Sequence, residues 1–286
     1  MREIDTGTDD LLARVEDGVA VLTLNRPARR NAMSGAMTSA LAEVLARVEV
    51  ADDVGCVVLT GAGSAFCAGG DVKDMSQASG AQAGGAQAGG AQAGAGRRRS
   101  VDEAIHLQRL NQRATSGRLH EMPKPTIASL PGAAAGAGLS LALACDLRYA
   151  AHGAVMTTAF ARVGFAGDYG GTWFLTHLVG TGKARELYYF SERIDAEEAQ
   201  RLGILNAVFP ADRLEEEVMA RARRLAAGPR IAHRYMKENL NRAELGELGQ
   251  CLDMEAAHHI HTGLTEDHRE AAAAFVEKRE PVFGGR

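Results

Sequence analysis

The feature that most restricts the fold of this chain is a run of seven residues, 132–138, that contains only glycine and alanine. A short apolar strand is predicted just before it, at 127–130, and the small apolar residues 139–145 after it predict a helix packed closely on other backbone. A second glycine-rich segment, 65–71 (AFCAGGD), follows another predicted strand. Such residues occur where the backbone passes too close to another group for a side chain to fit. The two segments therefore predict two tight approaches of the backbone.

Strands and helices alternate along the first part of the chain. Residues 19–24 (VAVLTL) and 54–60 are apolar runs that predict buried strands. Between them, apolar residues recur at helical spacing behind Ser34, a candidate N-cap: Met37, Leu41, Val44, Leu45 and Val48. This alternation predicts an α/β fold.

The predicted domain boundary lies near Pro210. Asp195–Glu198 and Asp212–Glu215 have the spacing of capping boxes, and Gly203 is placed to end the first of the two helices. Beyond this point the pattern is almost continuously helical. We expect a core at 1–210 and a helical C-terminal oligomerisation domain at 211–286.

A low-complexity insert interrupts the core. Residues 80–94 repeat GAQAG three times, without large apolar groups, which predicts a flexible surface loop over 80–96. The Arg97-Arg98-Arg99 run that follows fits either a solvated loop edge or a contact with a ligand phosphate.

Composition narrows the class of protein. The 286 residues are 46% hydrophobic, which is enough for a sizeable core, and the net charge of −4 gives no positive field for nucleic acid or an anionic membrane. The four cysteines form no CxxC pair, the N-terminus has no apolar signal segment, and 139–145 is too short to span a bilayer. We expect a cytoplasmic protein with no metal and no nucleic-acid or membrane partner.

The two glycine-rich segments suggest chemistry when they are taken together. Neither has the Gly-Lys-Ser/Thr ending of a phosphate-binding loop, and neither is a dinucleotide fingerprint in the right context. Each is separately explained as a tight turn. Two backbone N–H groups, one on a turn after a strand and one at a helix N-terminus, can also converge as an oxyanion hole for a thioester that becomes an enolate.

Five motifs extend this interpretation: NRPARRNAMS, LTGAGSAFCAGGDV, KPTIASLPGAAAGAGLSLALACDLRYA, DYGGTWFLTHLVG and AFVEKR. In this order they resemble the enoyl-CoA hydratase/isomerase (crotonase) superfamily, from about residue 13 to residue 282. The resemblance implies a crotonase-like spiral of ββα units, a helical C-terminal domain, and a homotrimer or a dimer of trimers.

The resemblance also implies the site residues. The oxyanion donors would be the N–H groups of Gly70 and Ala137. CoA would be bound by the 25–32 loop, by the segment around residues 68–72 and by two residues of a C-terminal helix, often from a neighbouring subunit; the residues concerned are Arg26, Arg29, Ala68, Asp71, Val72, Phe275 and Lys278. CoA would arrive as part of an acyl-CoA thioester substrate, so no separate cofactor is implied.

Departures from the hydratase pattern bear on the reaction. Hydratases of this family carry two glutamates that activate water, and this chain has Ser140 and Phe160 at those positions. Asp168 is the one acidic residue left in a family catalytic segment, although it could instead cap the following helix or order a turn. We expect an enoyl-CoA isomerase in which Asp168 moves a proton. An enoyl-CoA hydratase with atypical water activation and a non-catalytic acyl-CoA-binding trimer remain alternatives.

Other side chains are weaker candidates. His258, His259 and His261 lie near Glu255 without a metal-binding signature, so a packed or solvated helix face is expected. His106 and His120 are expected to be structural. Tyr169 and Trp173 are expected to line an acyl pocket.

Overall fold

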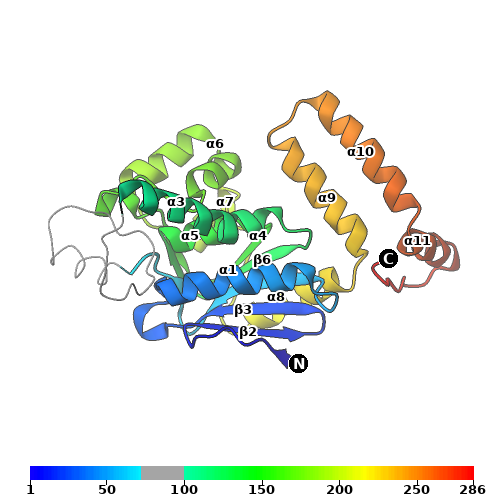
Figure 1. Cartoon of the computed structure of the whole chain (residues 1–286), viewed down its shortest axis with the longest axis horizontal. Coiled ribbons are helices and arrows are strands. Elements are labelled where there is room, and N and C mark those ends of the chain that lie inside the picture. Colours follow the sequence, from blue (N-terminus) through cyan, green and yellow to red (C-terminus); the bar gives the residue numbers. More distant parts are fainter. Residues whose placement is uncertain (72–99) are drawn as a thin grey trace.

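Two sheets built mainly from parallel strands form the body of the molecule (Figure 1). The computed structural model describes residues 1–71 and 100–286. Val72, the insert predicted at 80–96 and the Arg97-Arg98-Arg99 run lie outside the described residues.

The larger sheet has the strand order β1-β2-β3-β4-β6-β8-β11. The pairings from β3 to β11 are parallel, and β2 is antiparallel to both β1 and β3. The strands span Arg2–Glu3 (β1), Leu11–Glu16 (β2), Val19–Leu24 (β3), Cys56–Gly61 (β4), Thr126–Leu130 (β6), Leu147–Ala151 (β8) and Ala207–Phe209 (β11).

The smaller sheet has the order β10-β9-β7-β5. Its strands β5, β7 and β9 are parallel, and β10 is antiparallel to β9. The strands span Ala65–Cys67 (β5), Ala133–Ala135 (β7), Val155–Thr157 (β9) and Ile194–Asp195 (β10).

The chain alternates between the two sheets. It passes from β4 to β5, from β6 to β7 and from β8 to β9, each time moving from the larger sheet to the smaller one. A helical segment follows each passage: α3 (Val101–Gln112) with η2 (Arg113–Gly117) and α4 (Arg118–Glu121), then α5 (Ala137–Leu143), then η3 (Phe160–Val163) with α6 (Gly171–Phe190, interrupted at Gly180). The first two segments return the chain to β6 and β8 of the larger sheet, whereas the third leads to β10 of the smaller sheet. These repeats are the predicted ββα units.

The remaining helices lie at the two ends of this spiral. They are η1 (Pro27–Arg29), α1 (Gly35–Val50), α7 (Ala196–Arg201), α8 (Leu214–Ala226), α9 (Arg230–Ala243), α10 (Leu248–Gly263) and α11 (Glu266–Glu277). No helix in the described ranges combines the length and apolar character that crossing a membrane requires.

Both faces of the larger sheet are buried, which explains its continuous apolar strands. In β3, Ala20, Leu22 and Leu24 face the main core, whereas Val19 and Val21 face α8. Helix α8 contributes Leu214, Val218, Met219, Ala222 and Ala226 to that second core layer. Although α8 follows the boundary predicted near Pro210, it covers the sheet of the core, and the division at residue 210 stays a prediction.

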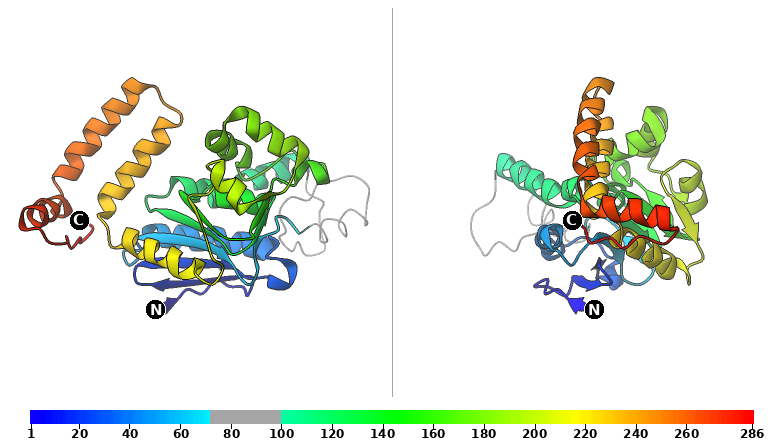
Figure 2. Two further views of the ribbon diagram at one scale, coloured as in Figure 1. Left: turned by 180° about the vertical axis from the view of Figure 1, so that it is seen from behind. Right: turned by 90° about the vertical axis from the view of Figure 1, so that its right-hand side faces the viewer.

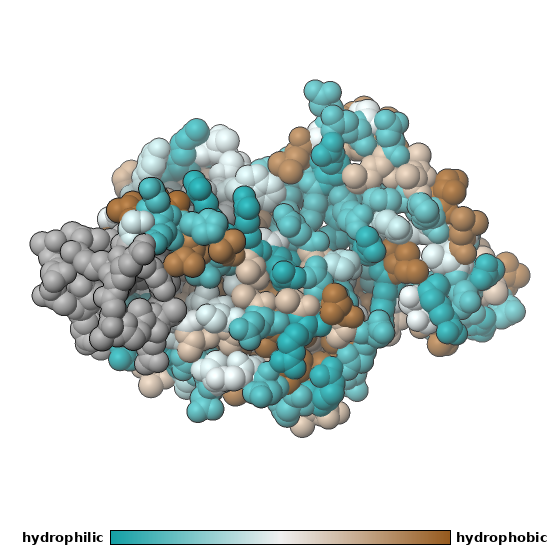
Figure 3. Space-filling view, viewed as in Figure 1, coloured by the Kyte–Doolittle hydropathy of each residue, from teal (hydrophilic) through white to brown (hydrophobic). Residues whose placement is uncertain are grey.

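Helices α9, α10 and α11 extend away from the body, on the side opposite α3, α5 and α6 (Figures 1 and 2). Large apolar side chains are exposed along this extension, including Leu248 (75%), Leu264 (72%) and Phe275 (86%). The space-filling view shows brown groups at this end of the molecule (Figure 3). The described chain therefore leaves an apolar surface uncovered on its C-terminal helices.

Most local predictions are confirmed. Ser34 caps α1 by accepting the Met37 N–H, and Asp195 caps α7 by accepting the Glu198 N–H. Gly203, two residues beyond the end of α7, has a φ of +81°. These features depend on residues close together in the chain, which is why the sequence alone predicts them.

Three boundaries differ from the prediction. Helix α8 begins at Leu214 without a side-chain cap, because a turn in which the Arg213 N–H binds the Pro210 carbonyl at 2.9 Å displaces the start beyond Asp212. Strand β4 begins at Cys56, since Val54 closes a turn onto Ala51. Within 132–138 the chain forms both β7 and the start of α5, separated only by Gly136, whose φ is +51°.

Candidate active site

Three neighbouring parallel strands of the smaller sheet, β5, β7 and β9, end at one edge. The residues that follow them are Gly69-Gly70, Gly136-Ala137 and Ala159-Phe160. Because the carboxyl ends of parallel strands share one edge, segments far apart in sequence meet there. This edge contains both predicted oxyanion donors and one of the two hydratase positions.

The segments that carry Gly70 and Ala137 are in contact. A Cβ on Gly69 would lie 2.8 Å from the Ala135 carbonyl oxygen and 3.5 Å from the Ala137 nitrogen. Gly69 has a φ of +91°, so glycine suits this position for two reasons. The structure thus brings the two predicted donor segments together.

The two N–H groups have few competing acceptors. Met33 donates its N–H to the Gly69 carbonyl at 2.8 Å in a parallel bridge with Gly70, and no bond from the Gly70 N–H occurs among the described residues. Ala137 is the first residue of α5, so its N–H has no acceptor within the helix. Gly70 is partly exposed, and Ala137 is 4% exposed.

The floor of the site is closely packed. A Cβ on Gly138 would lie 2.6 Å from Cys67 Cβ and 2.7 Å from its Sγ, which confirms the tight approach predicted from the small residues. Burial raises the pKa of the Cys67 thiol to about 12, against a smaller opposing effect of a hydrogen bond to Gly69. Cys67 is therefore a neutral packing residue at physiological pH.

The two hydratase positions are filled without carboxylates. Ser140 is 1% exposed and its Oγ donates to the Gly136 carbonyl at 3.3 Å. Phe160 is 6% exposed and stacks on Tyr188, with ring centroids 5.8 Å apart and an interplanar angle of 9°. A Cβ on Gly136 would lie 3.9 Å from Phe160 Cε1, which places this ring beside the start of α5.

Asp168 lies close to these residues. Its negative charge acts on both the Cys67 thiol and the Tyr188 hydroxyl. Tyr188 links the Asp168 turn to Ser140, because a Cβ on Gly171 would lie 2.6 Å from the Tyr188 hydroxyl and also in contact with Ser140 Oγ. The turn that carries Asp168 therefore lies beside Ser140 of α5.

The Asp168 side chain is partly buried, and one of its two carboxyl oxygens has no compensating hydrogen bond. Its Oδ1 is inaccessible and has no hydrogen-bond partner among the described residues. Burial raises its pKa from 3.8 to about 6. The alternative that Asp168 caps α6 is wrong, since the N-cap is Gly170 and no side chain caps that helix. A carboxyl with this pKa exchanges a proton readily near neutral pH.

Three of the predicted CoA-binding residues form one ion-paired group. Asp71 is 7% exposed and lies 3.1 Å from the Arg26 guanidinium and 3.6 Å from that of Arg29. Ala68, which is exposed, donates its N–H to the Arg30 carbonyl at 2.9 Å and so joins the 26–32 loop to the segment after β5. Arg29 is the more exposed of the two arginines, with 43% of its side chain accessible.

Asn31 organises this loop, and the sequence analysis did not identify it. It is fully buried with a φ of +56°. Its Nδ2 donates to the carbonyls of Ala62 and Ala65, at 2.9 and 2.8 Å, and its Oδ1 accepts the Arg26 N–H at 2.9 Å. An asparagine just after a short Pro-containing segment was the available signal, because asparagine tolerates positive φ.

The structure does not bring Phe275 and Lys278 to this site. Both belong to the end of α11, and that helix lies at the far end of the molecule from α5 (Figures 1 and 2). Phe275 is 86% exposed. Within one described chain these two residues are separate from the other candidates.

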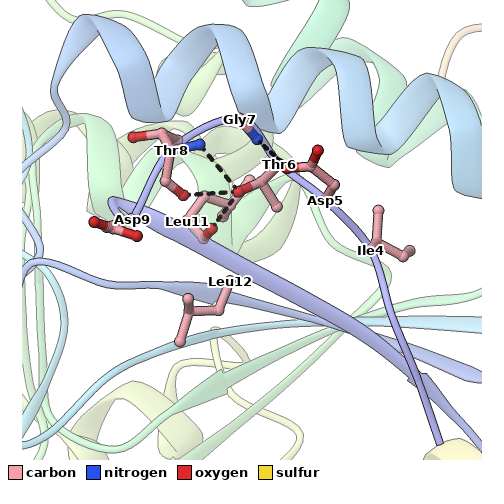
Figure 4. A pocket seen from close by; sticks show the side chains of 8 residues that line it. All are labelled: Ile4, Asp5, Thr6, Gly7, Thr8, Asp9, Leu11 and Leu12. Atoms are coloured by element: carbon pink, nitrogen blue, oxygen red, sulfur yellow. Dashed lines mark hydrogen bonds between the residues drawn. The ribbon is translucent and has the colours of Figure 1, made fainter.

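Two further cavities lie away from this edge. One, of about 430 Å³, lies at the carboxyl end of α5 and is lined by Trp173, His120 and Lys237 among others, so Trp173 faces away from the end where Ala137 lies. The other, of about 480 Å³, is an open surface hollow lined by residues between Ile4 and Leu12, where Thr6 Oγ1 lies 2.8 Å from the Thr8 carbonyl and 2.7 Å from the Leu11 carbonyl (Figure 4).

Of the histidine candidates, His258 and His120 pack against other side chains, whereas His106, His259 and His261 are exposed. His258 Nδ1 lies 2.6 Å from Asn239 Oδ1, and its ring lies against Tyr235, which joins α10 to α9. His120 makes an edge contact with Trp173, with ring centroids 5.3 Å apart.

Comparison with known proteins agrees with this geometry. The enoyl-CoA hydratase/isomerase family model matches residues 14–93 and 83–286. The chain is 35% identical over 276 residues to the 1,2-epoxyphenylacetyl-CoA isomerase of Escherichia coli K12, covering 96% of this chain and 98% of that protein. It is 36% identical over 275 residues to a Rhodobacter capsulatus protein named as a probable enoyl-CoA hydratase, covering 95% and 96%.

A solved structure of an enoyl-CoA hydratase from Bacillus anthracis superposes with a TM-score of 0.85 at 30% identity, covering 97% of this chain and 100% of that one. The fold and motifs define an enzyme that handles acyl-CoA thioesters. The chain belongs to the enoyl-CoA hydratase/isomerase family, and the predicted crotonase-like α/β fold is confirmed.

Proposed function

We propose that this protein is an enoyl-CoA isomerase. The observation that carries the proposal is the contrast between Asp168 and the two hydratase positions. Asp168 is a partly buried carboxyl with a pKa of about 6, whereas Ser140 and Phe160 supply no base for water. One carboxyl is sufficient for isomerisation, because the proton that it removes is returned to the same molecule.

The thioester oxygen would accept the N–H groups of Gly70 and Ala137. The Asp168 carboxylate would remove a proton from the carbon next to the double bond, and the negative charge would then move to the thioester oxygen. Two backbone donors at that oxygen stabilise the charge that develops in the transition state. The protonated Asp168 would return the proton to the other end of the conjugated system, which shifts the double bond without consuming water.

The CoA moiety would lie along the loop that contains Arg26, Arg29, Ala68 and Asp71. Arg29 is exposed enough to reach a phosphate, while Asp71 holds both guanidinium groups in place. Val72 belongs to the same proposed segment. Phe275 and Lys278 would contribute only from a neighbouring subunit, so a homotrimer or a dimer of trimers is part of the proposal. The exposed apolar side chains of α9–α11 support it, and light scattering that shows a monomer at micromolar concentration would contradict it.

The direct test measures turnover of 3-enoyl-CoA and 2-enoyl-CoA esters in deuterated water. An isomerase incorporates deuterium without net addition of water. Asp168→Asn should lower kcat about 100- to 10,000-fold with CoA-ester binding largely retained, and Asp212→Asn, at an exposed turn, should not.

The other outcomes identify the alternatives. Hydration of crotonyl-CoA at a rate typical of hydratases would show that a different group activates water. Tight binding of acyl-CoA with no turnover of any unsaturated ester would indicate a non-catalytic binding protein.

A further inference from the structure

The turn that carries Asp168 has an unusual backbone. The Gly171 N–H binds the Asp168 carbonyl at 3.0 Å, and the two central residues, Tyr169 and Gly170, have φ values of +48° and +75°. Positive φ at both central positions suits glycine or asparagine and is disfavoured for tyrosine. The surroundings must therefore hold Tyr169 in this conformation.

A side chain from another element provides that restraint. Gln112, the last residue of α3, accepts the Tyr169 N–H on its Oε1 at 2.6 Å, across 57 residues of sequence. Tyr169 is only 6% exposed, so water does not readily replace this acceptor. The ring end of Tyr169 is buried beside Thr38 of α1.

Asp168 depends on this turn for its direction. Its Oδ1 has no hydrogen-bond partner in the described ranges, and Gly167 on its other side has a φ of +120°. No side chain in the described part of the chain binds that oxygen, so the backbone of residues 167–170 aims the carboxyl. The bond from Gln112 fixes the peptide that joins Asp168 to Tyr169.

The helix that supplies Gln112 is itself specialised at this point. The chain continues directly from Gln112 into η2, a π-helical turn at Arg113–Gly117. Such wide turns are uncommon and often lie at functional sites, because they alter the direction of the side chains around them.

We propose that Gln112 is a positioning residue that holds the Asp168 turn in its reactive conformation. The proposal rests on the isomerase function proposed above. Gln112 acts through the Tyr169 peptide and does not touch the substrate.

The test compares two substitutions. Gln112→Met keeps the length of the side chain and removes the acceptor. Because the Asp168 carboxyl is then misplaced, kcat should fall about 10- to 100-fold, with KM little changed. Gln112→Glu keeps the acceptor and adds a negative charge, so it should recover most of the wild-type kcat at high pH. Gln108→Met, one turn earlier on α3, is the matched control and should behave as the wild type.

The pH profile separates positioning from a purely structural role. The groups that face Asp168 are the Cys67 thiol from β5, the Tyr188 hydroxyl from α6 and Tyr169 of its own turn, and burial raises the pKa of each, so all three are neutral near pH 6. A carboxylate at position 112 should therefore raise the pKa of Asp168 and move the acidic limb of kcat/KM to higher pH.

Two results would overturn the inference. The first is a Gln112→Met protein with wild-type kcat, whether or not it melts at a lower temperature, and the second is a Gln112→Glu protein with an unshifted pH profile of kcat/KM. If Asp168→Asn loses activity in the same assays, the proposed function survives these results. A fully active Asp168→Asn protein would instead overturn the proposed function itself.

Discussion

The Lys237 ammonium nitrogen lies 2.9 Å from Oδ2 of Asp146 and joins the first of the projecting helices to the body of the molecule. Lys237 is 7% exposed on α9, and its Nζ also donates to the carbonyls of Leu119 and Lys124, at 3.0 and 3.2 Å. Asp146 additionally accepts the Thr126 N–H at 2.8 Å. This buried group fixes the root of the C-terminal helices.

Replacing Lys237 should therefore destabilise the protein. Lys237→Met removes the cation that pairs with Asp146 and leaves two carbonyls without this donor, and we expect a loss of about 3 kcal/mol in the free energy of unfolding by urea titration. Lys183→Met is the control, because Lys183 pairs with Glu186 at the surface. Equal stability of the two variants would show that the buried pair does not anchor α9.

Removing the Ala137 N–H should slow turnover without unfolding the protein. Proline is tolerated at the first position of a helix, where the N–H has no helical acceptor, so Ala137→Pro deletes the donor selectively. We expect kcat to fall about 100- to 1,000-fold. Ala196→Pro makes the same change at the first residue of α7 and should keep its activity. Near-normal turnover of a folded Ala137→Pro enzyme contradicts the donor assignment.

Asp168→Asn should stabilise the fold in a pH-dependent manner. The folded-state pKa of about 6 lies above the ordinary value of 3.8, so the unfolded chain releases this proton first as pH rises. As pH rises from about 4 to about 6, ionisation of Asp168 lowers the stability of the wild type, and it causes no further loss above that range. The difference in Tm between variant and wild type should therefore grow across this interval and then stay constant, reaching a few degrees. If the difference in Tm is the same at pH 4 and pH 8, the pKa of the Asp168 carboxyl is not raised in the folded protein.

Asn31→Ala should disturb the predicted CoA-binding loop. The substitution removes three hydrogen bonds made by a buried side chain and places alanine at positive φ, so the free energy of unfolding should fall by about 2–4 kcal/mol. The KM for acyl-CoA esters should rise, since Arg26 and Arg29 lie in the same loop. Asn25→Ala, which removes one bond near the surface, should change stability by less than about 1 kcal/mol. If both variants show unchanged KM values, the loop does not bind CoA.

Features set by neighbouring residues were predictable from the sequence. The apolar run of β3, the caps at Ser34 and Asp195, and the exclusively small residues around Ala137 follow from local spacing and side-chain size. The ordered motifs were sufficient to indicate the family. The predicted capping box at Asp212 failed because a turn closed by Pro210 competed with it, and local spacing does not reveal which of two local structures forms.

Contacts between distant segments were decided by the tertiary structure. The order β10-β9-β7-β5 places the ends of three strands at one edge, and strand order is not encoded in the hydrophobic pattern of any single strand. Packing likewise joins Gln112 to Tyr169 and Asp146 to Lys237, pairs that lie 57 and 91 residues apart. The sequence by itself determined which residues are able to form the site, because size, charge and backbone freedom belong to each residue. Their neighbours, and with them the burial that raises the pKa of Asp168, were decided only when the strands and helices packed together.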